Sequence, residues 1–323
     1  PASSSHAQDL GRLVQGVALM PGTGEYALAS DVVQYSGGPG DAKPANEHTP
    51  SGLSDLKTSL NALEAELPAC GAASLIVSWF GGDLRCGECS LKPKVEHKHA
   101  EGSMPWSVSG VTRTAAEEVL KKDGEPLYGG TPADASVIQS IREMQGRGLR
   151  VMFYPFILMD QLDGNTLPDP YSDAGTQPKL PWRGRITLAK APGQAGSSDG
   201  TLSAHNEVAA FFGTVTAADF TVAGGQVDYS GPQEWSMSRF ILHYAALCKA
   251  AGGVEAFCIG TEMRGLTQIR GAGNSFVAVQ AFRALAAEAR LLLGAGTKIS
   301  YAADWSEYFG YHPQDGSGDV FFH

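Results

Sequence analysis

The stretch "VEAFCIGTEMRG", residues 254–265, is an apolar run that ends on a carboxylate, Glu262. A carboxyl group at the end of a buried strand could act as a general acid or base in the cleavage of a glycoside. Retaining glycosidases need two carboxyl groups about 5–5.5 Å apart, one as acid and one as nucleophile. The alternative is a solvated glutamate that pairs with Arg264 or Arg270. The position of Glu262 therefore makes it a candidate acid/base whose partner has to be found.

Aromatic and planar polar side chains stand where other apolar runs end, and such groups suit sugar binding. Pyranose C–H faces pack on aromatic rings, and planar polar groups hydrogen-bond to hydroxyls. Each aromatic alone could be an ordinary core or lid residue, but their shared position after strands favours a binding surface. The candidate substrate-binding residues are Trp79, Tyr154, Phe156, Trp182, Arg183, Asp304 and Trp305.

A cysteine pair in the motif "CGEC" is the one candidate for metal binding. Cys86 and Cys89, with His97 and His99, make the pattern C-x2-C-x7-H-x-H. Two thiolates and two imidazoles could hold Zn²⁺ tetrahedrally, although this is not the spacing of a common zinc module. A local Cys86–Cys89 disulfide and two free thiols are the other hypotheses. Nothing else in the sequence indicates a cofactor.

The composition excludes two classes of partner. The chain has 323 residues, of which 43% are hydrophobic, and its net charge is −10. That hydrophobic content is enough for a substantial core. An acidic chain without a block of Lys and Arg is poorly suited to nucleic acid or to an anionic membrane surface. A membrane-spanning helix would need a run of about 18 apolar residues, and the sequence has none.

The elements that must position these residues alternate between helices and apolar strands. Helices are expected within 51–68, 131–148, 203–213, 234–253 and 274–296, and a hairpin within 220–231. The expected strands are 14–19, 73–79, 150–157, 254–261 and 298–303, and a sixth strand could begin at Asp319. Alternation of this kind indicates βαβ units and a parallel sheet.

The long polar segments follow strands, as in a barrel whose active face lies at the carboxyl ends of its strands. We therefore predict an α/β fold, (β/α)8 TIM-barrel-like, with about five to six of the eight strands in this chain. Residues 1–12 would be a linker or a remnant of a preceding domain. Residues 13–323 would be the N-terminal part of the barrel, with long strand-to-helix loops at 82–130 and 161–234. We expect the chain to be a piece of a longer polypeptide that supplies the missing βα units.

Local signals place the element ends. Ser51 or Ser54 is the expected N-cap of the first helix, Thr131 that of the second, and Asn274 that of the last. The strand at 73–79 shows no strict alternation of apolar and polar residues, so it should be covered on both faces.

Several motifs together resemble the glycoside-hydrolase-like TIM-barrel domain of gene transfer agents and related phage tail proteins. They are "VSWFGGDLRCGEC", "GGTPADASVI", "GLRVMFYPFILMD", "PWRGRITL", "IGTEM" and "ISYAADWSEY", in this order from about residue 13 to the end of the chain. That family is similar to retaining endo-β-mannanases, in which the glutamate of the "GTE" motif is the acid/base. Glu262 matches that position. The mannanase pattern Lys-Pro-His is replaced here by Tyr154-Pro155-Phe156.

The resemblance implies a host-facing hub at the tip of a phage-like tail, with other tail proteins and a host-surface glycan as partners. It also implies a homotrimer, assembled in the bacterial cytoplasm and released with the particle. The barrel would bind a cell-envelope glycan; alternatively, it is an active retaining glycoside hydrolase that degrades envelope polysaccharide during entry. A free-standing cellular glycosidase is the remaining hypothesis. No residue of this chain can be assigned as the nucleophile.

Overall fold

A parallel β-sheet forms the centre of the computed structural model, which describes residues 10–22, 24–36, 42–313 and 316–321. Its strand order is β1-β4-β12-β15-β16, and every neighbouring pair along this path is parallel. A short strand, β5, adds to β4 in the antiparallel direction. The strands are β1 (Gly16–Leu19), β4 (Ala72–Gly81), β5 (Leu91–Lys92), β12 (Arg150–Met159), β15 (Ala256–Thr261) and β16 (Lys298–Ala302).

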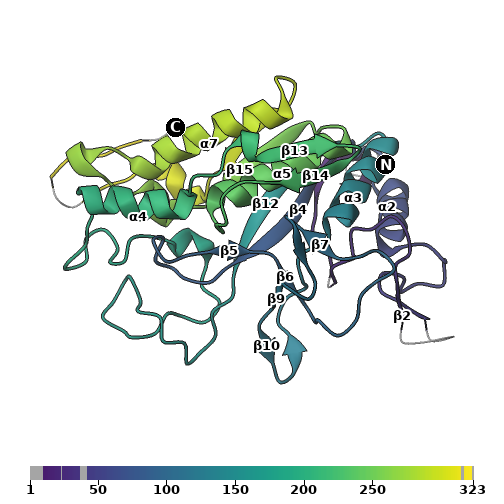
Figure 1. The fold of residues 1–323 in the computed structure, drawn as a ribbon. Helices are drawn as coiled ribbons and strands as arrows, with labels where there is room; N and C mark the ends of the chain where they lie inside the picture. The colour runs from purple at the N-terminus through teal and green to yellow at the C-terminus, as the bar shows by residue number, and fades with distance from the viewer. Residues whose placement is uncertain (1–9, 23, 37–41, 314–315, 322–323) are drawn as a thin grey trace, which may run out of the picture.

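Helices lie along one side of this sheet, above the strands in Figure 1. Helix α5 packs on both α3 and α7, and all three contact the central strands. The Ser54 hydroxyl accepts a hydrogen bond from Lys57 N, so it is the N-cap of α2, one of the two expected residues. The helices are α1 (Leu10–Leu13), α2 (Asp55–Glu66), α3 (Asp134–Gly146), α4 (Leu202–Phe212), α5 (Met237–Ala251), α6 (Arg264–Thr267) and α7 (Val277–Leu293).

The long segments between these elements carry small structures of their own. They include the 3-10 helices η1 (Arg183–Arg185), η2 (Ala217–Asp219), η3 (Ala272–Asn274) and η4 (Trp305–Phe309). The expected hairpin is formed by β13 (Phe220–Ala223) and β14 (Gln226–Tyr229). The remaining strands are β2 (Gln34–Ser36), β3 (Ala42–Pro44), β6 (Lys94–Val95), β7 (Ser107–Val108), β8 (Val111–Thr112), β9 (Glu117–Glu118), β10 (Lys121–Lys122) and β11 (Glu125–Pro126).

Side chains of the central strands alternate between a covered and an open face. Trp79 and Phe153 are fully buried, and both contact Tyr244 of α5. Tyr154 and Phe156 point to the opposite face and are only half-buried. In β4 the side chains of Ser74, Ile76 and Ser78 are also only partly buried, so the expectation that the strand at 73–79 is covered on both faces is wrong for the described residues. Helices cover one face, and within the described residues the other face stays partly open.

Two helix caps differ from their predictions. Helix α3 begins after Ala133, and the Thr131 hydroxyl instead donates to the carbonyl of Ser78 at 3.0 Å. Helix α7 begins after Phe276, whereas Asn274 closes η3. The Thr131 hydroxyl is therefore used by a contact with β4 and not by a cap of α3.

The α/β fold class with an incomplete barrel-like sheet is confirmed. All five predicted strands are present, and the sheet of the described residues is not closed. No sixth parallel strand forms within residues 316–321, where Val320 makes only an isolated antiparallel bridge to Tyr311. Among the described helices, none combines the length and apolar character needed to cross a bilayer.

Candidate functional site

Glu262 follows β15 directly, at the carboxyl edge of the sheet. Its backbone N donates to the carbonyl of Ala302 at 2.8 Å, so the pairing with β16 continues to this residue. The register shifts between Cys258 and Thr261, and Glu262 itself is left-handed, with φ of 52°. A non-glycine residue in this region costs about 1–3 kcal/mol, which the surrounding structure must offset. The strained turn changes the chain direction where the strand ends.

The Glu262 carboxylate is held through one oxygen. Oε2 accepts hydrogen bonds from Trp182 Nε1 at 2.9 Å and from Arg183 Nη2 at 2.7 Å. Among the described residues, Oε1 has no partner, and the side chain is 34% exposed. The Trp182 ring is also 37% exposed. One carboxylate oxygen and one aromatic ring are therefore both accessible to a ligand.

Arg183 links Glu262 to the open face of the sheet. Its Nε donates to the carbonyl and hydroxyl oxygens of Thr261 at 3.0 and 2.9 Å. The guanidinium lies over the ring of Phe156, 3.7 Å from the ring centroid. Burial lowers the pKa of Arg183, and the charge of Glu262 opposes this shift. Arginine stays protonated because its ordinary pKa is far above neutrality. Arg183 therefore provides a fixed positive charge beside Glu262.

A second network holds the backbone next to Glu262, and sequence reasoning missed it. Met263 N donates to the Tyr301 hydroxyl at 2.8 Å, and that hydroxyl donates to Glu307 Oε1 at 2.9 Å. Burial and the charge of Glu307 raise the pKa of Tyr301, so the hydroxyl keeps its proton. The spacing of Asp304 and Glu307 fits a capping box, and both capping bonds are present. That spacing could have identified Glu307, whereas Tyr301 carries no sequence signal.

Tyr301→Phe is expected to destabilise the protein by about 1–3 kcal/mol, because Met263 N would lose its acceptor and buried Glu307 a donor. Urea denaturation measures the loss. Leu291→Ala is the control, because this apolar side chain is exposed on α7 and takes no part in the network. Equal midpoints for the two variants would show that the network does not support the strained turn.

The structure gathers four of the predicted sugar-binding residues around Glu262. Trp182, Arg183 and Phe156 form the contacts above. Burial is the main cause of the raised pKa of Tyr154. The nearby charge of Glu262 also raises this pKa, whereas the charge of Arg183 lowers it. Within the described residues, Asp304 and Trp305 form no hydrogen bond or ion pair with Glu262. The Asp304 carboxylate accepts from Ser306 N, and the Trp305 ring is 73% exposed.

Trp79 is not a substrate-binding residue in this structure, which corrects its prediction. The side chain is fully buried and points toward α5, where Nε1 donates to the Tyr244 hydroxyl at 2.9 Å. It lies on the opposite face of the sheet from Tyr154. The strand period of two places Trp79 among the helices, so its role is in the core.

The structure does not bring the residues of the zinc and disulfide hypotheses for the "CGEC" motif together as a metal site or a disulfide. Cys86 and Cys89 are buried free thiols. Burial raises the pKa of Cys89 to about 12, so this thiol keeps its proton. The rings of His97 and His99 instead stack on each other at 4.2 Å. Among the described residues, no three His, Cys, Asp or Glu side chains are grouped to hold a metal ion.

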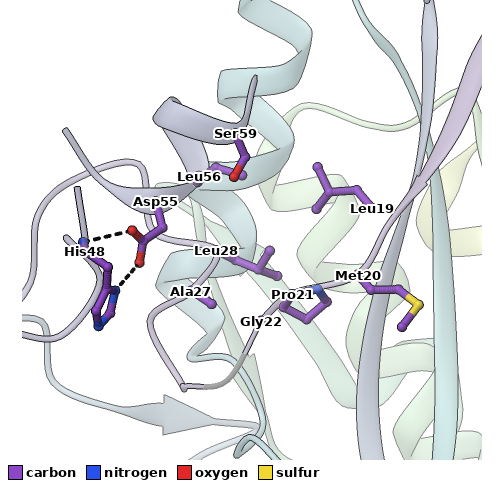
Figure 2. A pocket seen from close by; sticks show the side chains of 10 residues that line it. All are labelled: Leu19, Met20, Pro21, Gly22, Ala27, Leu28, His48, Asp55, Leu56 and Ser59. Atoms are coloured by element: carbon purple, nitrogen blue, oxygen red, sulfur yellow. Dashed lines mark hydrogen bonds and ion pairs between the residues drawn. The ribbon is translucent and has the colours of Figure 1, made fainter. Parts of the chain in front are cut away.

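A separate cavity of about 370 Å³ lies beside the end of β1 (Figure 2). Its polar lining includes a pair in which His48 Nδ1 lies 2.7 Å from Asp55 Oδ2, and the His48 backbone N donates to Asp55 Oδ1. Asp55 begins α2, where the helix dipole favours a negative charge. Ser59 also lines the cavity, but no hydrogen bond joins it to His48 in the described part of the chain. The pair anchors the segment before α2, and we assign it no catalytic role.

Comparison with known proteins gives one family match. Residues 235–323 match the model of the GTA TIM-barrel-like domain, which confirms the predicted resemblance for this part of the chain. The matched part begins just before α5 and contains β15, Glu262, Tyr301 and Glu307. A comparison with curated proteins gives no match.

Solved structures of GH113 β-mannanases are similar to this chain at low identity. The GH113 β-mannanase AaManA from Alicyclobacillus acidocaldarius in complex with ManMIm has a TM-score of 0.41 and 14% identity, over 91% of this chain and 55% of that chain. A complex of a GH113 β-1,4-mannanase has a TM-score of 0.38 and 15% identity, over 79% of this chain and 51% of that one. The chain spans about half the length of these structures.

Proposed function

Because residues 235–323 match the GTA TIM-barrel-like domain, we propose that this chain is a host-facing tail-tip hub component of a gene transfer agent or phage-like particle. Residues 13–323 form the N-terminal part of its barrel. The barrel binds a cell-envelope glycan at the site around Glu262. Its protein partners are other tail proteins, in a trimer at the tail tip, and the particle carries it out of the cell.

The observation that carries glycan binding is the cluster of Glu262, Trp182, Arg183 and Phe156. It combines a free carboxylate oxygen, a half-exposed indole and a fixed guanidinium within a few ångströms. A sugar needs such a combination, because its C–H face packs on an aromatic ring while its hydroxyls require fixed donors and acceptors. The contacts join segments about 80 residues apart, so the fold assembles a site that no local motif contains.

Replacement of Trp182 by alanine tests this function. The variant should bind a glycan about tenfold more weakly, because loss of a stacking ring costs about 0.5–1.5 kcal/mol and Glu262 loses one donor. Calorimetric titration of wild type and variant with manno-, cello-, xylo- and chitohexaose measures the change. Leu291→Ala, an exposed apolar position on α7, is the control. A wild-type protein that binds none of these glycans, nor isolated envelope polysaccharide, would refute the proposal.

The second candidate function is an active retaining glycoside hydrolase. The accessible Oε1 of Glu262 favours it, because an acid/base must reach the glycosidic oxygen. This function also needs a second carboxyl group about 5–5.5 Å away as nucleophile, and no residue of this chain is assigned to that role. Release of reducing ends from envelope polysaccharide separates hydrolysis from binding alone.

A further inference from the structure

A second cavity opens on the half-exposed face of the sheet, at the ends of β1, β4 and β12. We propose that this cavity is a subsite for an uncharged pyranose of the same glycan, on the other side of Phe156 from the Glu262 site. The inference rests on the proposed glycan-binding function and adds the position of a further sugar and its charge class.

The cavity has a volume of about 460 Å³, which lies in the range of small-molecule sites. Its floor comes from the open face of the sheet, and its wall is the segment 127–130 together with the end of β1. The residues that matter for recognition are Met20, Ile76, Ser78, Tyr128, Phe156 and Leu158.

Hydrogen bonds at the carboxyl end of the segment 127–130 hold this wall in place. Thr131 N donates to the carbonyl of Lys94 at 2.7 Å, and the Thr131 hydroxyl donates to the carbonyl of Ser78 at 3.0 Å. Gly130 N donates to Glu96 Oε1 at 3.1 Å. Because these bonds tie the segment to β4 and to the neighbouring loop, the cavity exists before a ligand arrives. A preformed site loses less conformational entropy on binding.

The lining predicts the chemistry of the ligand. No charged side chain lines the cavity, so an anionic sugar would lose its hydration without a compensating cation. Tyr128 and Phe156 supply aromatic rings. Within the described residues, the hydroxyls of Tyr128 and Ser78 have no hydrogen-bond partner, so both are available to sugar hydroxyls. Burial, with the charge of Asp160, raises the pKa of Tyr128 and keeps its hydroxyl a donor. A neutral pyranose satisfies these groups.

Phe156 connects this cavity to the Glu262 site. Its ring lines the cavity, and the Arg183 guanidinium covers the ring at 3.7 Å. Arg183 in turn donates to Glu262 Oε2 at 2.7 Å. The two sites are therefore separated by one phenylalanine ring and one guanidinium. An oligosaccharide that contacts Trp182 and Glu262 can therefore place a further unit against Tyr128.

The test is calorimetric titration of the chain with the four neutral hexaoses named above and with hexagalacturonic acid. Tyr128→Ala should weaken the best neutral ligand about tenfold, through loss of a ring and a hydroxyl. Tyr128→Phe and Ser78→Ala should weaken it less, and both keep the fold because each removes one unpartnered hydroxyl. Leu291→Ala should bind like wild type, and hexagalacturonic acid should bind more weakly than the neutral ligand.

Each of the other possible titration results would contradict a specific part of the proposal. If Tyr128→Ala binds like wild type while Trp182→Ala is weakened, the subsite is wrong and the glycan-binding function stands. If hexagalacturonic acid binds as tightly as the neutral ligand and loses affinity equally in Tyr128→Ala, the charge class is wrong. If wild type binds none of the probes or the envelope polysaccharide, both the function and the subsite fail.

Discussion

Glu262→Gln should lower any glycan hydrolysis by this protein about 10²–10⁴-fold, because proton transfer by a positioned side chain contributes about that much. The amide cannot transfer the proton, but its carbonyl oxygen can still accept hydrogen bonds from Trp182 and Arg183. The fold should therefore be unchanged. Reducing-end release and the melting temperature, measured on the same preparations, test both statements.

Glu255→Gln is the matched control, because Glu255 precedes the same strand at its opposite end and pairs with Lys298. It should leave hydrolysis unchanged. Equal hydrolysis by wild type and Glu262→Gln would show that Glu262 is not the acid/base. A wild type inert on all glycans that it binds would remove the enzyme hypothesis and leave the binding function.

Arg113→Met is expected to destabilise the protein by about 3–5 kcal/mol, because it leaves a buried carboxylate without its cation. Arg113 is 2% exposed, and its guanidinium lies 3.2 Å from both oxygens of Glu25, which is 0% exposed. Glu101 accepts from Arg113 Nε at 3.0 Å. Urea denaturation measures the change. The double variant with Glu25→Gln should recover part of the loss, because the stranded charge is then removed.

Lys121→Ala is the control for Arg113, since its pair with Glu118 is at the surface and should contribute less than about 1 kcal/mol. If both variants lose a similar amount of stability, the buried pair of Arg113 and Glu25 contributes no more than a surface pair. The Arg113 variant should also weaken glycan binding. Glu25 Oε1 accepts from Glu96 N, and Glu96 in turn holds Gly130 in the wall of the second cavity.

The sequence by itself determined the strands of the sheet and the position of Glu262. Each of the five central strands is a short apolar run bounded by glycine, proline or polar residues, a signal that does not depend on distant contacts. Helices between these runs require parallel strands, and parallel strands bring their carboxyl ends to one edge. Glu262, Trp182 and Phe156 could therefore be assigned to the same region before any contact was known.

Only the tertiary structure decided which side chains face the site. Trp79 and Phe156 both lie near strand ends, but a strand sends successive side chains to opposite faces, and the helix layer covers the face that holds Trp79. The bonds of Arg183 to Glu262 and of Arg113 to Glu25 join residues 79 and 88 positions apart. Such pairs leave no periodic signal, because their spacing depends on how loops return to the sheet. The strained turn at Glu262 is likewise fixed by Tyr301 and Glu307, and the fold alone brings these two residues beneath it.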